Sequence, residues 1–72
     1  MMVIEITTDM IRLGQMLKVC GIAENGGAAK AMIQDGLVKV NDEVTLQRGK
    51  QIVPGDIVKV MDHEILVQRE TV

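Results

Sequence analysis

The stretch that decides the fold runs from Ala28 to Val44 and reads AAKAMIQDGLVKVNDEV. Between residues 28 and 34, small and aliphatic side chains recur at the three- and four-residue spacing of one helix face: Ala29, Met32 and Ile33. Gly36 is the type of residue that ends a helix. After it, two valines alternate with Lys39, as in a strand that is buried on one face. The stretch therefore predicts a helix, a corner at Gly36 and a strand over 37–40.

Another helix is expected before this stretch, because apolar side chains recur with helical spacing from residue 10 to residue 20: Met10, Leu13, Leu17 and Cys20. Thr7 and Thr8 are candidate N-caps for it, and Gly21 is a candidate C-terminal glycine. Gly14 lies inside this helix, where glycine costs about 1 kcal/mol relative to alanine unless another backbone packs closely against it. Asn25-Gly26-Gly27 forms a natural cap and turn before the helix over 28–34.

Outside the two helices, short aliphatic segments bounded by turn-forming residues predict strands: 3–6, 37–40, 44–46, 52–53, 57–61 and 65–68. The turns among the later strands are expected at Asn41-Asp42-Glu43, Pro54-Gly55-Asp56 and Asp62-His63-Glu64. The pattern predicts an α+β fold in which two short helices pack on a small, curved, mainly antiparallel sheet. A chain of 72 residues forms a single domain over residues 1–72.

The composition favours a small protein with a core of aliphatic side chains. Hydrophobic residues make up 47% of the chain and supply that core without disulfides. Cys20 is expected to be a small core residue, and a single cysteine fits a reducing compartment. The N-terminal residues do not have the pattern of a signal peptide, and no apolar run approaches the ~18 residues of a membrane helix. We expect a cytoplasmic protein without membrane association.

Catalysis and metal binding are not expected from the available side chains. His63 is the only histidine, it is expected to be an exposed turn residue, and it has no partner for a catalytic triad or a zinc site. We therefore predict no catalytic residues, no metal and no cofactor, and we expect the protein not to be an enzyme. The six methionines are expected to fill the core.

Two properties bear on nucleic-acid binding. The net charge of −2 argues mildly against it, although a local cluster of cations matters more to a phosphate than the total charge does. The chain contains no phenylalanine, tyrosine or tryptophan. Recognition of single strands by stacking bases on aromatic side chains is therefore not expected.

Several segments in register resemble the S-four RNA-binding domain family, which is named after small-subunit ribosomal protein four. The matching segments are IRLGQMLKVCGI, AAKAMIQDGLVKVN and VPGDIVKV, and the similarity extends over about residues 11–60. Within the family, the chain is most similar to the short stand-alone bacterial members, which carry an LGQ-x-LK first helix and a GG-x-A-K second helix. The resemblance implies the alpha-L fold of the family and binding of structured RNA.

The chain departs from the family pattern at two places. The family commonly has Ser-Arg at the start of the second helix, where this chain has Asn25-Gly26, and an acidic residue often follows Arg-Leu, where this chain has Gly14. Lys30, one helical turn further on, is a candidate to replace the missing arginine. For Asn25-Gly26-Gly27 two interpretations stay open: a flexible cap that starts a helix, or backbone amides that receive one RNA phosphate.

We expect the RNA-binding surface to comprise the two helices, the corner into the first hairpin and the polar loop over 47–51. Lys30 and Lys39, on either side of the corner, are expected to face one RNA backbone. The candidate RNA-binding residues are Arg12, Gln15, Lys18, Asn25, Gly26, Gly27, Lys30, Gln34, Lys39, Asn41, Arg48 and Lys50.

The leading hypothesis is a non-enzymatic module that recognises structured RNA by backbone charge and shape. The resemblance indicates ribosomal RNA, or an intermediate of ribosome assembly, as the target. Phosphate contacts alone do not separate RNA from DNA, so DNA stays open. The alternative is a protein-interaction module that docks on a larger enzyme or on ribosomal proteins. A solvated cationic face without a ligand is the simplest explanation of the lysines and arginines taken alone.

Overall fold

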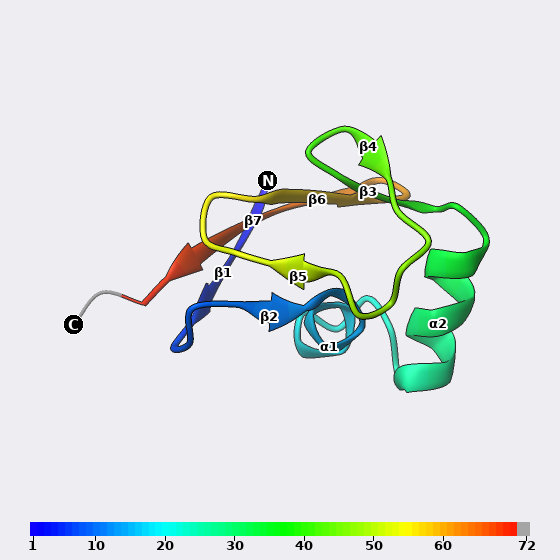
Figure 1. The fold of residues 1–72 in the computed structure, drawn as a ribbon, viewed down its shortest axis with the longest axis horizontal. Helices are drawn as coiled ribbons and strands as arrows, with labels where there is room; N and C mark the ends of the chain where they lie inside the picture. The colour runs from blue at the N-terminus through cyan, green and yellow to red at the C-terminus, as the bar shows by residue number, and fades with distance from the viewer. Residues whose placement is uncertain (71–72) are drawn as a thin grey trace.

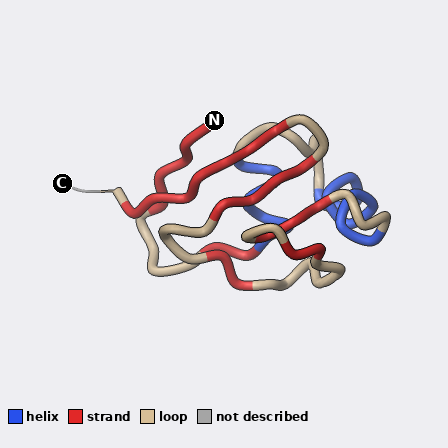
Figure 2. Tube along the Cα trace, turned by 90° about the horizontal axis from the view of Figure 1, so that it is seen from above, coloured by secondary structure: helices blue, strands red, loops and turns tan. Residues whose placement is uncertain are grey.

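The computed structural model describes residues 1–70. Its main element is a five-stranded sheet in the order β1-β7-β6-β3-β4. These strands are Met2–Ile6 (β1), Val38–Val40 (β3), Glu43–Val44 (β4), Ile57–Val60 (β6) and His63–Arg69 (β7). The β1–β7 pair is parallel and the other pairs are antiparallel, so the sheet is mainly antiparallel, as predicted. Figure 2 shows the strands from above in red, with helical segments in blue at one end of the molecule.

Two helices and a second, two-stranded sheet complete the fold (Figure 1). The helices are Leu13–Val19 (α1) and Gly26–Gln34 (α2), and the small sheet pairs Ile11–Arg12 (β2) with Gln51–Ile52 (β5). In the view of Figure 1, α1 lies below the five-stranded sheet, and α2 lies at the end of the molecule and leads into β3. The α+β architecture with two helices on a mainly antiparallel sheet is confirmed. None of the helices within residues 1–70 is long and apolar enough to cross a membrane.

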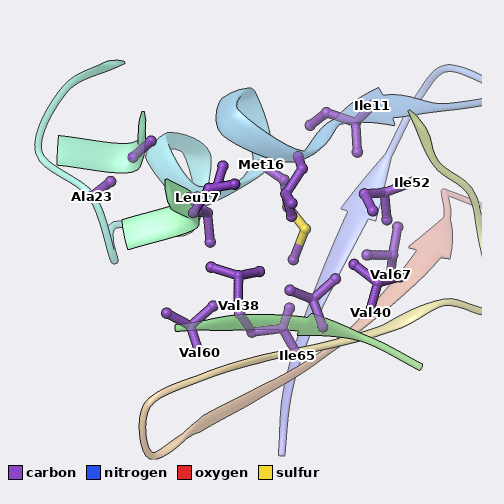
Figure 3. Close-up of a cluster of buried hydrophobic side chains, with 14 of the residues drawn as sticks. Ile11, Met16, Leu17, Ala23, Val38, Val40, Ile52, Val60, Ile65 and Val67 are labelled. Atoms are coloured by element: carbon purple, nitrogen blue, oxygen red, sulfur yellow. The ribbon is translucent and has the colours of Figure 1, made fainter. Parts of the chain in front are cut away.

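The core lies between the helices and one face of the five-stranded sheet. Alternation along the strands turns Val38 and Val40 inward together with the facing residues of β6 and β7. Figure 3 shows Met16 and Leu17 of α1 directed toward Val38. The following side chains are completely buried: Leu13, Met16, Leu17, Ala29, Ile33, Val38, Ile52, Val58, Val60, Ile65 and Val67.

The first helix begins later than the sequence predicts. Its N-cap is Arg12, whose side chain makes no capping hydrogen bond, so the prediction of an N-cap at Thr7 or Thr8 is wrong. Ile11 and Arg12 are extended because they pair with β5. Carbonyl groups of the loop before β5 accept hydrogen bonds from the first helical amides, so tertiary structure replaces the side-chain cap. Gly21 follows the helix with a φ of 81°, as predicted for a C-terminal glycine.

The second helix and the corner after it form as predicted. Asn25 is the N-cap, and its side-chain oxygen accepts a hydrogen bond from the amide of Ala28 at 2.8 Å. Gly36 ends the helix with a φ of 77°, a conformation that is unfavourable for residues with a Cβ atom. The hairpin turn that follows has Asn41 and Asp42 at φ of 51° and 71°. Two positive φ values in succession are typical of a type I′ turn, which matches the twist of the adjoining strands.

Several boundaries and placements differ from the predictions. β4 covers 43–44 and not 44–46, and the strand expected at 52–53 covers 51–52 and belongs to the small sheet. His63 is exposed, but it starts β7, because Met61 and Asp62 already complete the turn. Met16 is completely buried, whereas Met1, Met2 and Met61 are exposed, so the assignment of all six methionines to the core is wrong.

Candidate nucleic-acid interface

A groove of about 400 Å³ lies where α1, the start of α2 and the loop before β5 meet. Three of its lining side chains are cationic and none of its lining residues is acidic. A groove lined in this way favours anions, because the low-dielectric wall keeps the charges from being screened. Its lining residues are Arg12, Gly14, Gln15, Lys18, Gly26, Ala29, Arg48 and Gly49.

Backbone hydrogen bonds fix the loop over 47–51 against the start of α1. The amide of Leu13 donates to the carbonyl of Lys50 at 2.9 Å, and the amide of Gly14 donates to the carbonyl of Arg48 at 3.0 Å. The guanidinium of Arg12 donates through Nη1 to the carbonyl of Gly49 at 2.9 Å. Residues that are 34 or more positions apart therefore form one unit, and this unit brings Arg12 and Arg48 into the same groove.

The floor of the groove depends on small residues. Gly14 is buried, and the side chain of Arg48 passes directly over it. A Cβ atom placed on Gly14 would lie 2.8 Å from Cγ of Arg48 and 3.5 Å from its carbonyl oxygen. The close contact at Gly14 is therefore with the side chain of Arg48, and the backbone of that loop lies at an ordinary distance. On the α2 side, the groove is lined by Gly26 and Ala29, whose small size leaves space for it.

Two further candidate residues continue the groove along α2. Lys30 and Gln34 are exposed and follow Gly26 at intervals of four residues, so they lie on the same face of the helix. Asn25 caps the helix with its side-chain oxygen, which is therefore already engaged within the protein. Gly27 follows the cap, and a Cβ atom there would meet that same oxygen at 3.3 Å.

Lys39 lies outside this groove. It alternates with the inward-facing Val38 and Val40, so its side chain lies on the face of the sheet that is turned away from α1. Its neighbours across the strands are Val44 and Lys59. The structure therefore does not bring Lys39 to the surface on which Lys30 lies.

The charges around Lys39 are partly neutralised. Nζ of Lys59 lies 2.9 Å from a carboxylate oxygen of Asp42. This hydrogen bond and the charge of Lys59 lower the pKa of Asp42, while the same hydrogen bond, the charge of Asp42 and that of Glu64 raise the pKa of Lys59. The face of the sheet that carries Lys39 thus has mixed charge, in contrast to the groove.

Asn41 and Lys50 also lie outside the groove. The side-chain amide of Asn41 donates to Asp56 at 2.9 Å and accepts from the amide of Ile57 at 3.0 Å, so its polar atoms serve the fold. Lys50 lines a separate hollow beside β4, which also contains Glu43.

Three residues line the groove although they are not among the candidate RNA-binding residues: Gly14, Ala29 and Gly49. Ala29 was assigned to the buried helix face, and it is indeed buried while still forming the floor. Gly49 contributes a carbonyl group to Arg12, and a backbone acceptor has no signal in the residue type. Among residues 1–70, no group of three or more histidine, cysteine, aspartate or glutamate side chains could hold a metal ion.

Comparisons with known proteins agree with this architecture. The family model of the S4 domain matches residues 4–68. A probable ribosome maturation protein, RlbA from Bacillus subtilis (strain 168), is 42% identical over 57 residues, a stretch that covers 79% of this chain and 80% of that protein. The model match spans nearly the whole length described, and it includes both helices and all five strands of the main sheet at least in part. The chain belongs to the S4 domain family.

Proposed function

We propose that this protein is a non-enzymatic RNA-binding module that binds structured RNA through the groove between α1, α2 and the loop over 47–51. The observation that carries the proposal is the convergence of Arg12, Lys18 and Arg48 on one groove that no acidic residue lines. A chain with a net charge of −2 thereby offers a locally cationic surface. Membership of the S4 domain family supports RNA as the ligand.

The proposed target is ribosomal RNA or an intermediate of ribosome assembly, and the proposed location is the cytoplasm. The support is the name of the relative, a probable ribosome maturation protein that shares 42% identity with this chain. We propose ribosomal proteins as further partners in such an assembly.

The proposed mode of recognition is contact with the RNA backbone. No aromatic side chain is present on which a base could stack, whereas arginine and lysine bind phosphate oxygens. Gln15 in the groove and Gln34 on α2 supply neutral donors and acceptors for 2′-hydroxyl groups. Such contacts position an RNA helix or junction by its shape and carry little sequence information.

The test is fluorescence anisotropy with a labelled hairpin of ribosomal RNA at several salt concentrations. If about four phosphates are neutralised, the logarithm of the affinity falls with the logarithm of the salt concentration at a slope near −3. Lys18→Gln combined with Lys30→Gln should weaken binding and reduce the magnitude of the slope by about 1.4–1.8. Binding by the unchanged protein that is absent or insensitive to salt would refute the proposal.

Lys39→Gln is the matched control for this experiment. It removes the same charge from an exposed lysine on the opposite face of the sheet. We expect this variant to retain nearly the affinity and salt slope of the unchanged protein. If Lys39→Gln weakens binding as much as the Lys18 and Lys30 changes do, the RNA-binding surface is not the groove. A duplex DNA of the same length in the same titration separates RNA recognition from general attraction to phosphates.

A protein-docking function is the second candidate, because aliphatic side chains are exposed on the uncovered face of the sheet. Val3 on β1 and Val44 on β4 are 49% and 54% exposed. Recovery of partners from a lysate with and without ribonuclease distinguishes the two functions. Recovery that depends on RNA supports the RNA-binding proposal, and recovery that survives ribonuclease supports docking on a protein.

A further inference from the structure

We infer that Gly14 is a positioning residue for RNA binding and that it acts through Arg48. The inference rests on the proposed function of the groove. Gly14 is the second residue of α1, and it is buried although it lies at the groove. What covers it is the aliphatic part of the Arg48 side chain, whose Cγ and Cδ atoms lie 2.8 and 3.4 Å from the position of a Cβ on Gly14.

The space above Gly14 determines where the guanidinium of Arg48 can lie. The backbone of Arg48 is already fixed, because its carbonyl accepts the amide of Gly14 at 3.0 Å. With the backbone held, the side chain can cross α1 toward Arg12 and Lys18 only if the helix surface below it is flat. Glycine provides that surface, whereas any side chain at position 14 would occupy the path of Cγ.

Neither helix propensity nor backbone conformation explains why position 14 is a glycine. Glycine within a helix is less favourable than alanine by about 1 kcal/mol. Gly14 does not need positive φ, since the positive-φ glycines among residues 1–70 are Gly21, Gly36 and Gly55. The close atoms around Gly14 belong to the middle of the Arg48 side chain, and the nearest backbone atom is at an ordinary contact distance of 3.5 Å. Alanine at position 14 would therefore displace the arginine and leave the backbone in place.

The test compares Gly14→Ala, Arg48→Gln and the double variant in the RNA titration described above. We expect each single change to weaken binding about tenfold, the usual effect of losing one charge-assisted hydrogen bond. Each should also reduce the magnitude of the salt slope by about 0.7–0.9, the value for one phosphate contact. In the Arg48→Gln background, Gly14→Ala should have no further effect. Val19→Ala is the control on the same helix, because Val19 is 64% exposed and does not line the groove, and it should leave RNA binding unchanged.

Two results would overturn the inference while leaving RNA binding intact. One is a Gly14→Ala variant that binds RNA as tightly as the unchanged protein. The other is a loss of affinity on Gly14→Ala that is equally large with and without Arg48. If the unchanged protein shows no salt-sensitive binding of RNA, the proposed function fails and the inference falls with it.

A second measurement covers the case in which Gly14→Ala does not fold. Nitrogen-15 relaxation at Nε of Arg48 in the unchanged protein reports whether the side chain is held over α1. An order parameter close to that of the helical backbone supports the inference. A low order parameter, typical of a side chain that moves freely in solvent, overturns it.

Discussion

At the scale of single residues, Asn41 and Asp56 join two turns that are far apart in the sequence. The carboxylate of Asp56 accepts hydrogen bonds from the side chain of Asn41 and from the amide of Val53, both at 2.9 Å. Asn41 in turn accepts from the amide of Ile57 at 3.0 Å. The turn after β3 is thus bonded to the turn before β6, and Asn41 is held in the left-handed conformation that its place in the turn requires.

We predict that Asp56→Ala lowers the free energy of unfolding by about 1–2 kcal/mol, because it removes two hydrogen bonds to a charged acceptor that is only partly exposed. Urea denaturation followed by circular dichroism measures this loss. Asp62→Ala is the control: Asp62 is exposed, and its carboxylate makes no hydrogen bond within the described part of the chain. It should change stability by less than about 0.5 kcal/mol. Equal effects of the two changes would show that the hydrogen bonds of Asp56 do not contribute to the free energy of unfolding.

The residue types predicted turns at 41–43 and 54–56, but not the bond between them. Asparagine, glycine and aspartate mark turns by their local chemistry, and this information is present in the sequence. Which two turns meet depends on the register of β3 against β6, which local preference does not specify. For the same reason, Asn41 was assigned to RNA binding, whereas its side chain is engaged within the fold.

At the scale of secondary-structure elements, the two helices begin in different ways. α2 begins with a local cap, in which Asn25 accepts the amide of Ala28. α1 begins where the carbonyls of Arg48 and Lys50 accept its first amides. A local cap can be predicted from residue type and spacing, and α2 was predicted on that basis. The start of α1 depends on residues that are 34 or more positions away, which is why Thr7 and Thr8 were wrongly assigned as its cap.

We predict that Asn25→Ala destabilises the protein by about 1 kcal/mol, the usual cost of removing an N-cap side chain. Thr8→Ala is the control, because Thr8 does not cap α1 and its hydroxyl only donates to the carbonyl of Met10 in an exposed turn. It should cost less than about 0.5 kcal/mol. Thermal denaturation of both variants at the same pH measures the difference. If Thr8→Ala proves the more costly of the two, the observed start of α1 is contradicted.

At the scale of the whole molecule, one small core supports the sheet, both helices and the groove. Leu17 on α1 is completely buried and faces the valines of the sheet. Domains of this size rarely have more than about 3–5 kcal/mol of net stability from their core. A single large cavity therefore removes most of the available stability, and the groove would be lost together with the fold.

We predict that Leu17→Ala lowers the free energy of unfolding by about 2–5 kcal/mol and leaves much of the protein unfolded at 37 °C. Val19→Ala on the same helix is the matched control, since Val19 is 64% exposed and should cost less than about 0.5 kcal/mol. Guanidinium denaturation, or amide hydrogen exchange where Leu17→Ala is too unstable, measures both. Cooperative unfolding of Leu17→Ala near the midpoint of the unchanged protein would contradict the prediction.

The α+β class and both helices followed from hydrophobic periodicity, which is a local property. The separate β2–β5 sheet and the parallel β1–β7 pair could not be predicted in this way, because both join distant segments. The groove was predicted in part. Arg12, Lys18 and Arg48 are predicted RNA-binding residues, and the fold brings them together in the groove. Lys39 lies on the opposite face of the sheet. Strand alternation alone predicts that Lys39 points outward, but it does not tell on which side of the sheet the helices pack.

The parallel pairing of β1 with β7 has a consequence for the order of events on the translating ribosome. β1 lies at the edge of the sheet, and within the described residues its one partner strand is β7. Residues 2–6 therefore cannot form their strand pairing until residues 65–69 have been synthesised. The growing polypeptide carries an aliphatic segment without a partner during that interval, and closure of the sheet comes last.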